Sequence, residues 1–141
     1  MTQILNNENE IIFQAEGTLK EVVEQAIREG VSLEGAVLKG ADLRGANLKD
    51  SDLSEANLDK ANLKDADLEY AYMERASVYH ADLSKANLAE AMLQYCDFSY
   101  SDLRSAILVN ADFRHSDMVY ADLRGANIAN VDFRDTNWIF I

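Results

Sequence analysis

Apolar and polar residues recur along most of this chain with a period of five. From Val31 to Phe140 the sequence divides into twenty-two successive five-residue blocks without an insertion or deletion. The third residue of every block is large and apolar, and the first is small in nearly every block, most often Ala. The second is Asp or Asn in sixteen blocks, so a short polar side chain separates the two nonpolar positions. This period matches neither an α-helix nor an alternating β-strand.

A period of five fits a short extended segment followed by a corner. Residues two apart in an extended segment point to the same side, so the first and third residues face inward and the second faces outward. If each corner turns the chain by about a right angle, four blocks close one square coil and residues twenty apart stack. Twenty-two blocks then make about 5.5 coils. A fixed internal repeat is typical of a solenoid, whose units bury their apolar faces by stacking on one another.

The first thirty residues lie outside the repeat, so we divide the chain into a cap at 1–30 and a solenoid at 31–141. Gln3–Leu5 and Ile11–Ala15 are typical of two short strands around a polar turn. We expect the cap to cover the open apolar end of the first coil and to protect its edges.

A helix is predicted at 18–29, the last part of the cap. Thr18 is a suitable N-cap, and Glu21 three residues later completes a capping box. Gly30 is placed to end the helix. One apolar stripe runs along the helix, through Leu19, Val22, Val23, Ala26 and Ile27. Packing of this stripe on the first coil is the favoured interpretation, and a partner-binding helix is the alternative.

The block pattern A(D/N)LXX resembles the pentapeptide repeat family, over residues 31–140. The resemblance implies the fold of that family, a right-handed four-sided β-helix. The prediction is therefore an all-β solenoid of about 5.5 coils with an N-terminal strand hairpin and helix as its cap.

The composition of the chain limits which kinds of partner and which cellular compartment we expect. The formal net charge of −12 argues against nonspecific binding to nucleic acid or to an anionic membrane surface. The single cysteine, Cys96, takes an inward position and has no second cysteine to pair with. Residues 1–10 lack a secretory signal pattern, and no apolar stretch approaches the ~20 residues that span a membrane. We expect a cytoplasmic protein with no membrane contact.

The reactive side chains do not form a pattern typical of an enzyme. His80 and His115 both occupy corner positions, but on different columns of the coil. Neither metal-ligand spacings such as HExxH and CxxC nor a Gly-rich phosphate loop occurs. The recurring Asp and Asn are explained by hydrogen bonds to the local backbone. We therefore expect no catalytic residues, no cofactor and no metal.

The outward positions give two candidate contact surfaces. One face of the coil becomes aromatic toward the C-terminus, and exposed aromatic residues are typical of contact surfaces, although simple stacking between coils is an equal alternative. The candidate partner surface comprises Tyr79, His80, Tyr95, Tyr100 and His115. Apolar residues near the C-terminal end predict a tail-to-tail homodimer, as the resemblance also implies, because related proteins dimerise through their C-terminal ends. The candidate dimer interface comprises Val119, Tyr120, Trp138, Ile139, Phe140 and Ile141.

Charged outward positions bear on a second function class. On one face, Asp42, Asp102 and Asp122 each precede an Arg by two residues, which predicts a solvated surface of alternating charge. Elsewhere acidic residues gather in a candidate patch of Asp50, Asp52, Glu55, Asp65, Asp67, Glu69 and Glu74. Some pentapeptide repeat proteins are acidic rods that bind DNA gyrase and protect it from quinolones. The resemblance therefore implies DNA mimicry as an alternative to a protein-binding scaffold with an unknown partner.

The charge count favours the scaffold. The repeat region, 31–141, holds nineteen acidic and eleven basic residues, a net charge of −8. Coils stacked ~4.8 Å apart make a rod of roughly 26 Å. Duplex DNA of that length carries about 15 negative charges. The rod has only about half of this charge, and no face is an unbroken acidic column.

Overall fold

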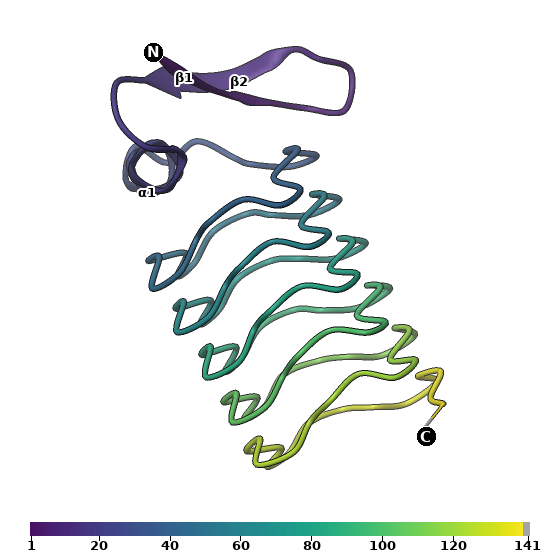
Figure 1. Ribbon diagram of the computed structural model, residues 1–141. Coiled ribbons are helices and arrows are strands. Elements are labelled where there is room, and N and C mark those ends of the chain that lie inside the picture. The colour runs from purple at the N-terminus through teal and green to yellow at the C-terminus, as the bar shows by residue number, and fades with distance from the viewer. Residues whose placement is uncertain (140–141) are drawn as a thin grey trace.

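A computed structural model describes residues 1–139 of the chain. Figure 1 shows a hairpin and a helix at one end of a stack of coils that continues to the C-terminal end. The hairpin pairs β1 (Thr2–Leu5) antiparallel with β2 (Ile11–Ala15), and α1 (Leu19–Arg28) follows it. The repeat region forms the predicted right-handed, four-sided β-helix.

Each coil of the β-helix contains four blocks, as predicted. Parallel bridges join residues twenty apart, from Val37 with Asn57 to Asp117 with Asn137. We number the faces 1 to 4 after the blocks that begin at residues 31, 36, 41 and 46 and their equivalents in later coils. Backbone hydrogen bonds run from coil to coil on every face, for example from the Leu63 N–H to the Asp82 carbonyl at 2.7 Å. Hydrogen bonds on all four faces therefore hold successive coils together.

The corners are β-turns with a left-handed residue at the fifth position. The Ala66 N–H donates to the Leu63 carbonyl at 3.0 Å, which closes a four-residue turn. Lys60 has a φ of 59° and His80 a φ of 56°, and the same positive φ recurs at the fifth position of the other blocks through Asp135. A positive φ at the third residue of a hydrogen-bonded turn is typical of type II. Glycine favours this conformation, but most blocks place a larger residue there.

The second residue of the block stabilises the corner that follows it. The Asp82 carboxylate accepts the Ser84 N–H at 2.9 Å, and the Asn62 amide oxygen accepts the Lys64 N–H at 3.1 Å. Both are short side chains that reach a backbone N–H two residues on, which explains the preference for Asp and Asn. The prediction that these residues serve the backbone is confirmed.

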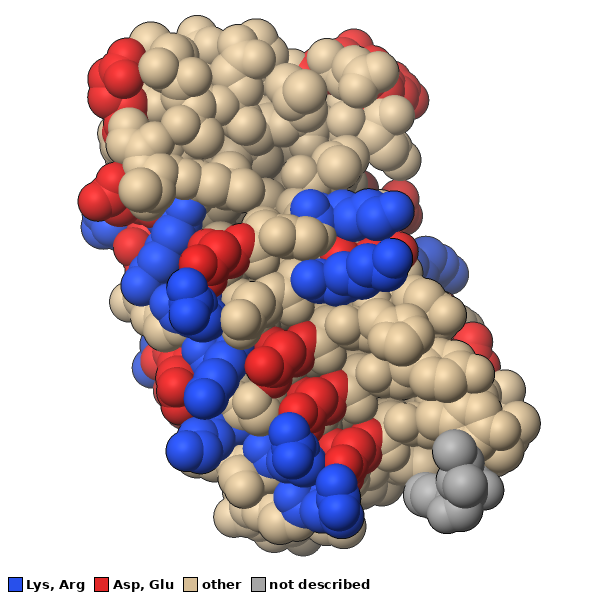
Figure 2. Space-filling model, in the orientation of Figure 1, with Lys and Arg blue, Asp and Glu red and all other residues tan. Residues whose placement is uncertain are grey.

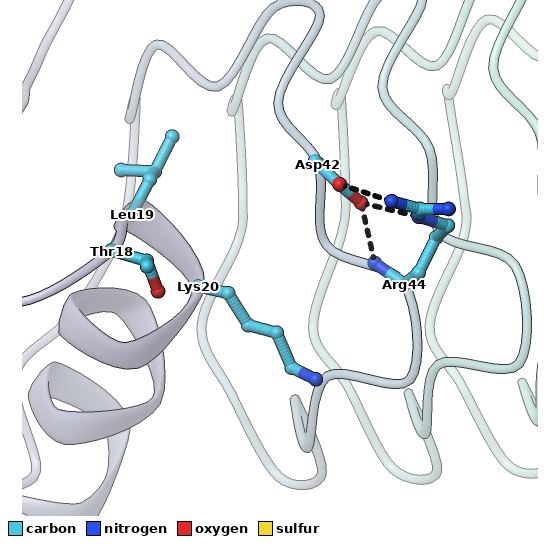
Figure 3. A pocket seen from close by; sticks show the side chains of 5 residues that line it. All are labelled: Thr18, Leu19, Lys20, Asp42 and Arg44. Atoms are coloured by element: carbon cyan, nitrogen blue, oxygen red, sulfur yellow. Dashed lines mark hydrogen bonds and ion pairs between the residues drawn. The ribbon is translucent and has the colours of Figure 1, made fainter.

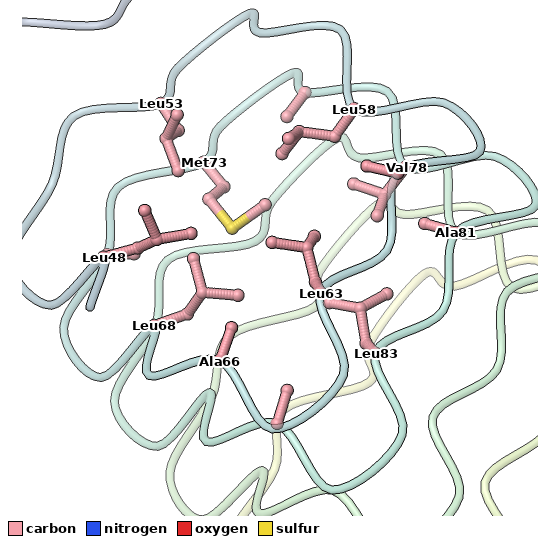
Figure 4. Close-up of a cluster of buried hydrophobic side chains, with 14 of the residues drawn as sticks. Leu48, Leu53, Leu58, Leu63, Ala66, Leu68, Met73, Val78, Ala81 and Leu83 are labelled. Atoms are coloured by element: carbon pink, nitrogen blue, oxygen red, sulfur yellow. The ribbon is translucent and has the colours of Figure 1, made fainter. Parts of the chain in front are cut away.

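The core is a narrow apolar column inside the coil. Figure 4 shows Leu63 and Leu83 from successive coils pointing into the tube among Leu and Ala side chains from the other faces, and both are fully buried. Small first residues such as Ala66 leave room for these Leu side chains. Toward the C-terminal half, Phe98 and Phe113 pack with ring centroids 5.1 Å apart. The inward positions are therefore those that the sequence predicts.

The N-terminal elements meet the first coil through both backbone and side chains. Thr18 and Glu21 form the predicted capping box, and the apolar stripe of α1 packs inward with Val22, Val23 and Ala26 buried. The Val37 N–H donates to the Leu5 carbonyl at 2.8 Å, and the Asn47 N–H donates to the Glu24 carboxylate at 2.9 Å. Both donors belong to the first coil. β1 begins one residue earlier than predicted, at Thr2.

Candidate functional site

A column of stacked aromatic rings follows the corner at the end of face 2. His80, Tyr100 and Tyr120 are fifth residues of successive coils, so stacking of the coils stacks their rings. The His80 and Tyr100 rings lie 4.9 Å apart with planes within 6°, and Tyr100 lies 5.1 Å from Tyr120. Tyr79 meets His80 and Tyr100 edge-on at 4.6 and 5.7 Å. We call Tyr79, His80, Tyr100 and Tyr120 the first aromatic column.

A second column follows the corner at the end of face 1. The Tyr95 and His115 rings stack 4.8 Å apart with planes within 10°. The Arg75 guanidinium lies 5.1 Å from the centre of the Tyr95 ring, and an Asp135 carboxylate oxygen lies 3.8 Å from the His115 Nδ1. We call Arg75, Tyr95, His115 and Asp135 the second column. Sequence reasoning missed Arg75, although its spacing of twenty residues from Tyr95 was a usable signal.

The two columns border the same face. Face 2 begins one residue after the Tyr95 column and ends at the Tyr100 column, so its outward residues lie between them. These are Ser77, Asp97 and Asp117 at second positions and Tyr79, Ser99 and Val119 at fourth positions. The structure therefore places four of the five predicted partner-surface residues at the two edges of one face and Tyr79 between them. We call this face the aromatic face.

Faces 1 and 3 carry paired charges instead. On face 3 the predicted pairs form, with Asp102 and Arg104, for example, 2.6 Å apart. Face 1 repeats the arrangement with Asp112–Arg114 and Asp132–Arg134, which sequence reasoning missed although the Asp-x-Arg spacing is identical. The hydrogen-bonded guanidinium of Arg134 lowers the pKa of Asp132 to about 2. Figure 2 shows basic and acidic side chains in adjacent stripes, whereas the lower right of this view is largely uncharged.

The seven acidic residues of the candidate mimic patch do not share one face. Asp50, Asp67 and Glu69 belong to face 4, and Asp65 lies at the corner before it. The other members, Asp52, Glu55 and Glu74, belong to face 1. Lys49 lies 3.0 Å from the Glu69 carboxylate, and Arg75 lies 3.1 Å from the Glu74 carboxylate. The patch thus bends around a corner of the rod, and two of its members have basic partners.

The predicted dimer residues lie on the last described coil and just before it. Val119 and Tyr120 are half-buried, Trp138 is half-buried with its ring 5.1 Å from that of Phe133, and Ile139 is 48% exposed. The remaining two, Phe140 and Ile141, lie outside the described residues.

A hollow with charged side chains lies between α1 and face 3. The hollow has a volume of about 510 Å³ and is lined by Thr18, Leu19, Lys20, Asp42 and Arg44. Figure 3 shows Lys20 extending from α1 toward the coil, where Asp42 is bonded to Arg44 at 2.6 Å. Over residues 1–139, no three His, Cys, Asp or Glu side chains gather closely enough to hold a metal ion. Burial raises the pKa of the Cys96 thiol to about 12. A helix of membrane-spanning length and apolarity is also absent from this part of the chain.

Solved structures of two pentapeptide repeat proteins resemble this fold. One, a pentapeptide repeat protein of Nostoc PCC 7120, is 26% identical, matches 89% of this chain and 99% of its own, and gives a TM-score of 0.64. A second, from the thylakoid lumen of Arabidopsis thaliana, is 28% identical over 70% of this chain and 69% of its own, with a TM-score of 0.51. QnrB1, a plasmid-mediated fluoroquinolone resistance protein, is 18% identical over 79% of this chain and 68% of its own, with a TM-score of 0.40.

A comparison with curated proteins finds no significant match. A family model described as pentapeptide repeats (8 copies), however, matches residues 32–69, 71–108 and 106–137. These segments cover most of the chain and coincide with the coils of the β-helix. The chain therefore belongs to the pentapeptide repeat family.

Proposed function

We propose that the protein is a non-enzymatic scaffold that binds another protein through the aromatic face. The observation that carries this proposal is the exposure of the stacked rings. Tyr95 and Tyr100 are 49% and 43% exposed although each packs against ring neighbours. Stacking between coils therefore accounts for only part of their surface. Exposed aromatic side chains that lie together are typical of protein-contact surfaces.

The rigidity of the columns also supports a binding role. Binding normally costs free energy because mobile side chains become ordered. The His80 and Tyr100 rings stack in parallel, and the Tyr79 ring packs edge-on against both of them. Their conformations are thus largely set before a partner arrives, which reduces this cost. The backbone beneath them is held by coil-to-coil hydrogen bonds, for example from the His80 N–H to the Ser99 carbonyl at 3.0 Å.

Local charge pairing favours the scaffold over DNA mimicry. A DNA mimic needs rows of unpaired negative charge that stand in for phosphates. On faces 1 and 3, the carboxylates of Asp42, Asp102, Asp112, Asp122 and Asp132 instead pair with the Arg two residues on. A gyrase supercoiling assay with and without a quinolone tests the alternative: inhibition of supercoiling or protection from the drug would favour DNA mimicry.

Affinity capture with matched tyrosine variants tests the scaffold. The bait is the full chain, either as the wild type or as the Tyr95→Ser/Tyr100→Ser variant. Each bait is incubated in lysate of its own source and cross-linked to the proteins that it binds. The control is Tyr70→Ser/Tyr72→Ser, since these tyrosines are 46% and 52% exposed but belong to faces 4 and 1. We expect the wild type and the control to retain a protein that the first variant loses. Equal retention by all three baits would contradict the proposal.

A further inference from the structure

We infer that the segment bound on the aromatic face is a cationic, extended peptide segment of the partner, rich in Arg or Lys. This inference rests on the proposed function and adds the chemistry of the partner. It depends on two carboxylates, those of Asp97 and Asp117, which lie one coil apart between the aromatic columns.

These carboxylates lack the basic partner that Asp102 and Asp112 have on the neighbouring faces. Asp97 accepts the Ser99 N–H at 2.9 Å, and Asp117 accepts the Asn137 side-chain amide at 3.1 Å. Within the described chain, neither forms an ion pair, whereas Asp102 and Asp112 each contact an Arg at 2.6–2.7 Å. The reason is in the sequence, because the fourth residue of these face 2 blocks is Ser99 or Val119 rather than Arg.

The outward residues between the aromatic columns therefore carry negative charge, and Arg75 at the edge of the face is paired with Glu74 at 3.1 Å. From residue 76 onward, the face 2 blocks contain no Lys or Arg, as 76–80, 96–100 and 116–120 show. Asp97 and Asp117 lie ~4.8 Å apart along the stack, so their charges repel each other. A guanidinium or ammonium group placed beside both would relieve that repulsion and would form charge-assisted hydrogen bonds.

The aromatic columns offer surface for the apolar stems of Arg and Lys side chains. Arg and Lys carry long apolar stems that pack on aromatic surface while the charged group stays with its partner. Tyr95 and Tyr100 supply this surface on opposite edges of the face, and their hydroxyl groups can accept hydrogen bonds from donors. A neutral apolar segment would leave the two carboxylates unpaired, and an acidic one would be repelled. The overall charge of −12 also speeds the approach of a cationic partner.

A titration with synthetic peptides tests the inference. The full ¹⁵N-labelled chain is titrated at physiological salt with peptides of about twelve residues that alternate Ser with Arg, Gln or Glu, a length that spans the rod when extended. We expect the Arg peptide to shift the amide signals of Asp97, Ser99, Tyr100 and Asp117, and the Gln and Glu peptides to leave them unchanged. Asp97→Asn/Asp117→Asn should weaken the affinity for the Arg peptide about tenfold, equivalent to ~1.4 kcal/mol.

A charge-matched variant separates a specific surface from attraction to an acidic protein. Asp67→Asn/Asp82→Asn removes the same two charges at second positions, but on faces 4 and 3. Asn retains an oxygen that can accept the turn N–H that each Asp accepts now. We expect this variant to bind the Arg peptide like the wild type.

The outcomes distinguish this inference from the proposed function. Equal weakening by both variants, equal binding of the Gln peptide, or no shift with the Arg peptide would each overturn the cationic partner. None of these results decides the capture experiment. A scaffold that binds an uncharged segment would still lose its partner in Tyr95→Ser/Tyr100→Ser, and the proposed function fails only if that loss is not seen.

Discussion

From Gly35 to Asp135, the fifth residue of each block adopts a left-handed backbone conformation. Every corner from Gly35 to Asp135 has a positive φ, yet only four of these positions are Gly. A left-handed conformation costs a residue with a side chain roughly 1–2 kcal/mol. In return, the fifth position projects side chains outward at the corners, where His80 can stack on Tyr100 and Tyr95 on His115. Glycine at these corners would lower the strain but would remove the aromatic columns.

We therefore expect Lys60→Gly to stabilise the protein. Lys60 is exposed with a φ of 59°, and its N–H, which donates to the Tyr79 carbonyl, remains in the variant. Relief of the strain outweighs the greater entropy of the unfolded chain, so the free energy of unfolding should rise by up to about 1 kcal/mol. The control is Lys64→Gly at a fourth position, where φ is not positive, and it should lower the free energy by about 0.5–1 kcal/mol. Urea unfolding measures both, and a loss of similar size in the two variants would contradict this account.

The Asp-x-Arg pairs give a second prediction at the residue scale. The Arg124 guanidinium donates to Asp122 and lowers the pKa of that carboxyl to about 2, below the ordinary value of about 3.9. A lowered folded-state pKa stabilises the fold above pH ~4, and this contribution is lost as the pH falls through 2. Arg124→Gln should raise the pKa of Asp122 toward the ordinary value, as followed by ¹³C carboxyl shifts. Asp132, held by Arg134, should still titrate at about 2, and parallel shifts of both groups would argue against local pairing.

Among the elements, the helix and hairpin supply hydrogen-bond acceptors to two faces of the first coil. In later coils, the second-position N–H donates to a carbonyl of the coil before, as the Asn87 N–H does to Ala66 at 2.9 Å. The first coil has no coil before it. β1 supplies a substitute acceptor at Leu5 for face 2, and α1 supplies Glu24 for face 4. The N-terminal elements thus replace part of a missing coil in addition to covering apolar side chains.

We expect Glu24→Ala to destabilise the protein through this contact. Loss of the carboxylate leaves the Asn47 N–H without its acceptor, which should lower the free energy of unfolding by about 1–2 kcal/mol. Ala has a higher helix propensity than Glu, so helix propensity would produce the opposite change. Glu29→Ala serves as the control, because Glu29 lies at the C-cap of α1 and binds only within the helix. Thermal and urea unfolding measure both, and equal stability of Glu24→Ala and the wild type would exclude a role for the contact.

At the scale of the whole molecule, the rod presents several surfaces that each extend over successive coils. The aromatic face lies toward the C-terminal half, and a separate apolar surface lies on the coil at 121–139. On that coil Ile128 and Ile139 are 50% and 48% exposed, while Leu123 and Phe133 are half-buried. Apolar area of this kind is buried readily by a second copy, with the same surface used on both chains.

We accordingly propose a homodimer through this coil and expect Ile139→Glu to weaken it. A charge in the contact would have to lose its water on association, so the variant should sediment as a monomer at concentrations where the wild type is dimeric. Ile11→Glu is the matched control, because Ile11 is 52% exposed at the opposite end of the rod. The circular dichroism spectra of the wild type and both variants should be the same, as expected if all three proteins retain the β-helix. A wild type that sediments as a monomer at high concentration would contradict the homodimer.

The coil and its register can be predicted from the amino-acid sequence, because both depend on local spacing. Alternation of a small first residue with a large third residue can bury apolar area only if the second faces outward, and the strict period of five repeats that choice without slippage. The capping box at Thr18 and Glu21 likewise involves residues three apart, and the structure confirms it. Five partner-surface residues could be named for the same reason, since the outward fourth and fifth positions are read from the register.

Which outward side chains act together depends on how the coils stack in three dimensions. Arg75 reaches the Tyr95 ring, Glu24 reaches the Asn47 N–H, and face 2 lies between two aromatic columns. The two contacts join residues about twenty or more positions apart, and the third arrangement involves adjacent faces. All three depend on side-chain conformation as well as on register. The repeat places several possible contact residues near each charged or aromatic side chain. Which of these contacts forms is settled only when the coils stack. The sequence already shows that Asp97 and Asp117 have no Arg in their own blocks. The stacked coils show in addition that Arg104, Arg114 and Arg124 on faces 1 and 3 pair with the carboxylates of their own blocks instead.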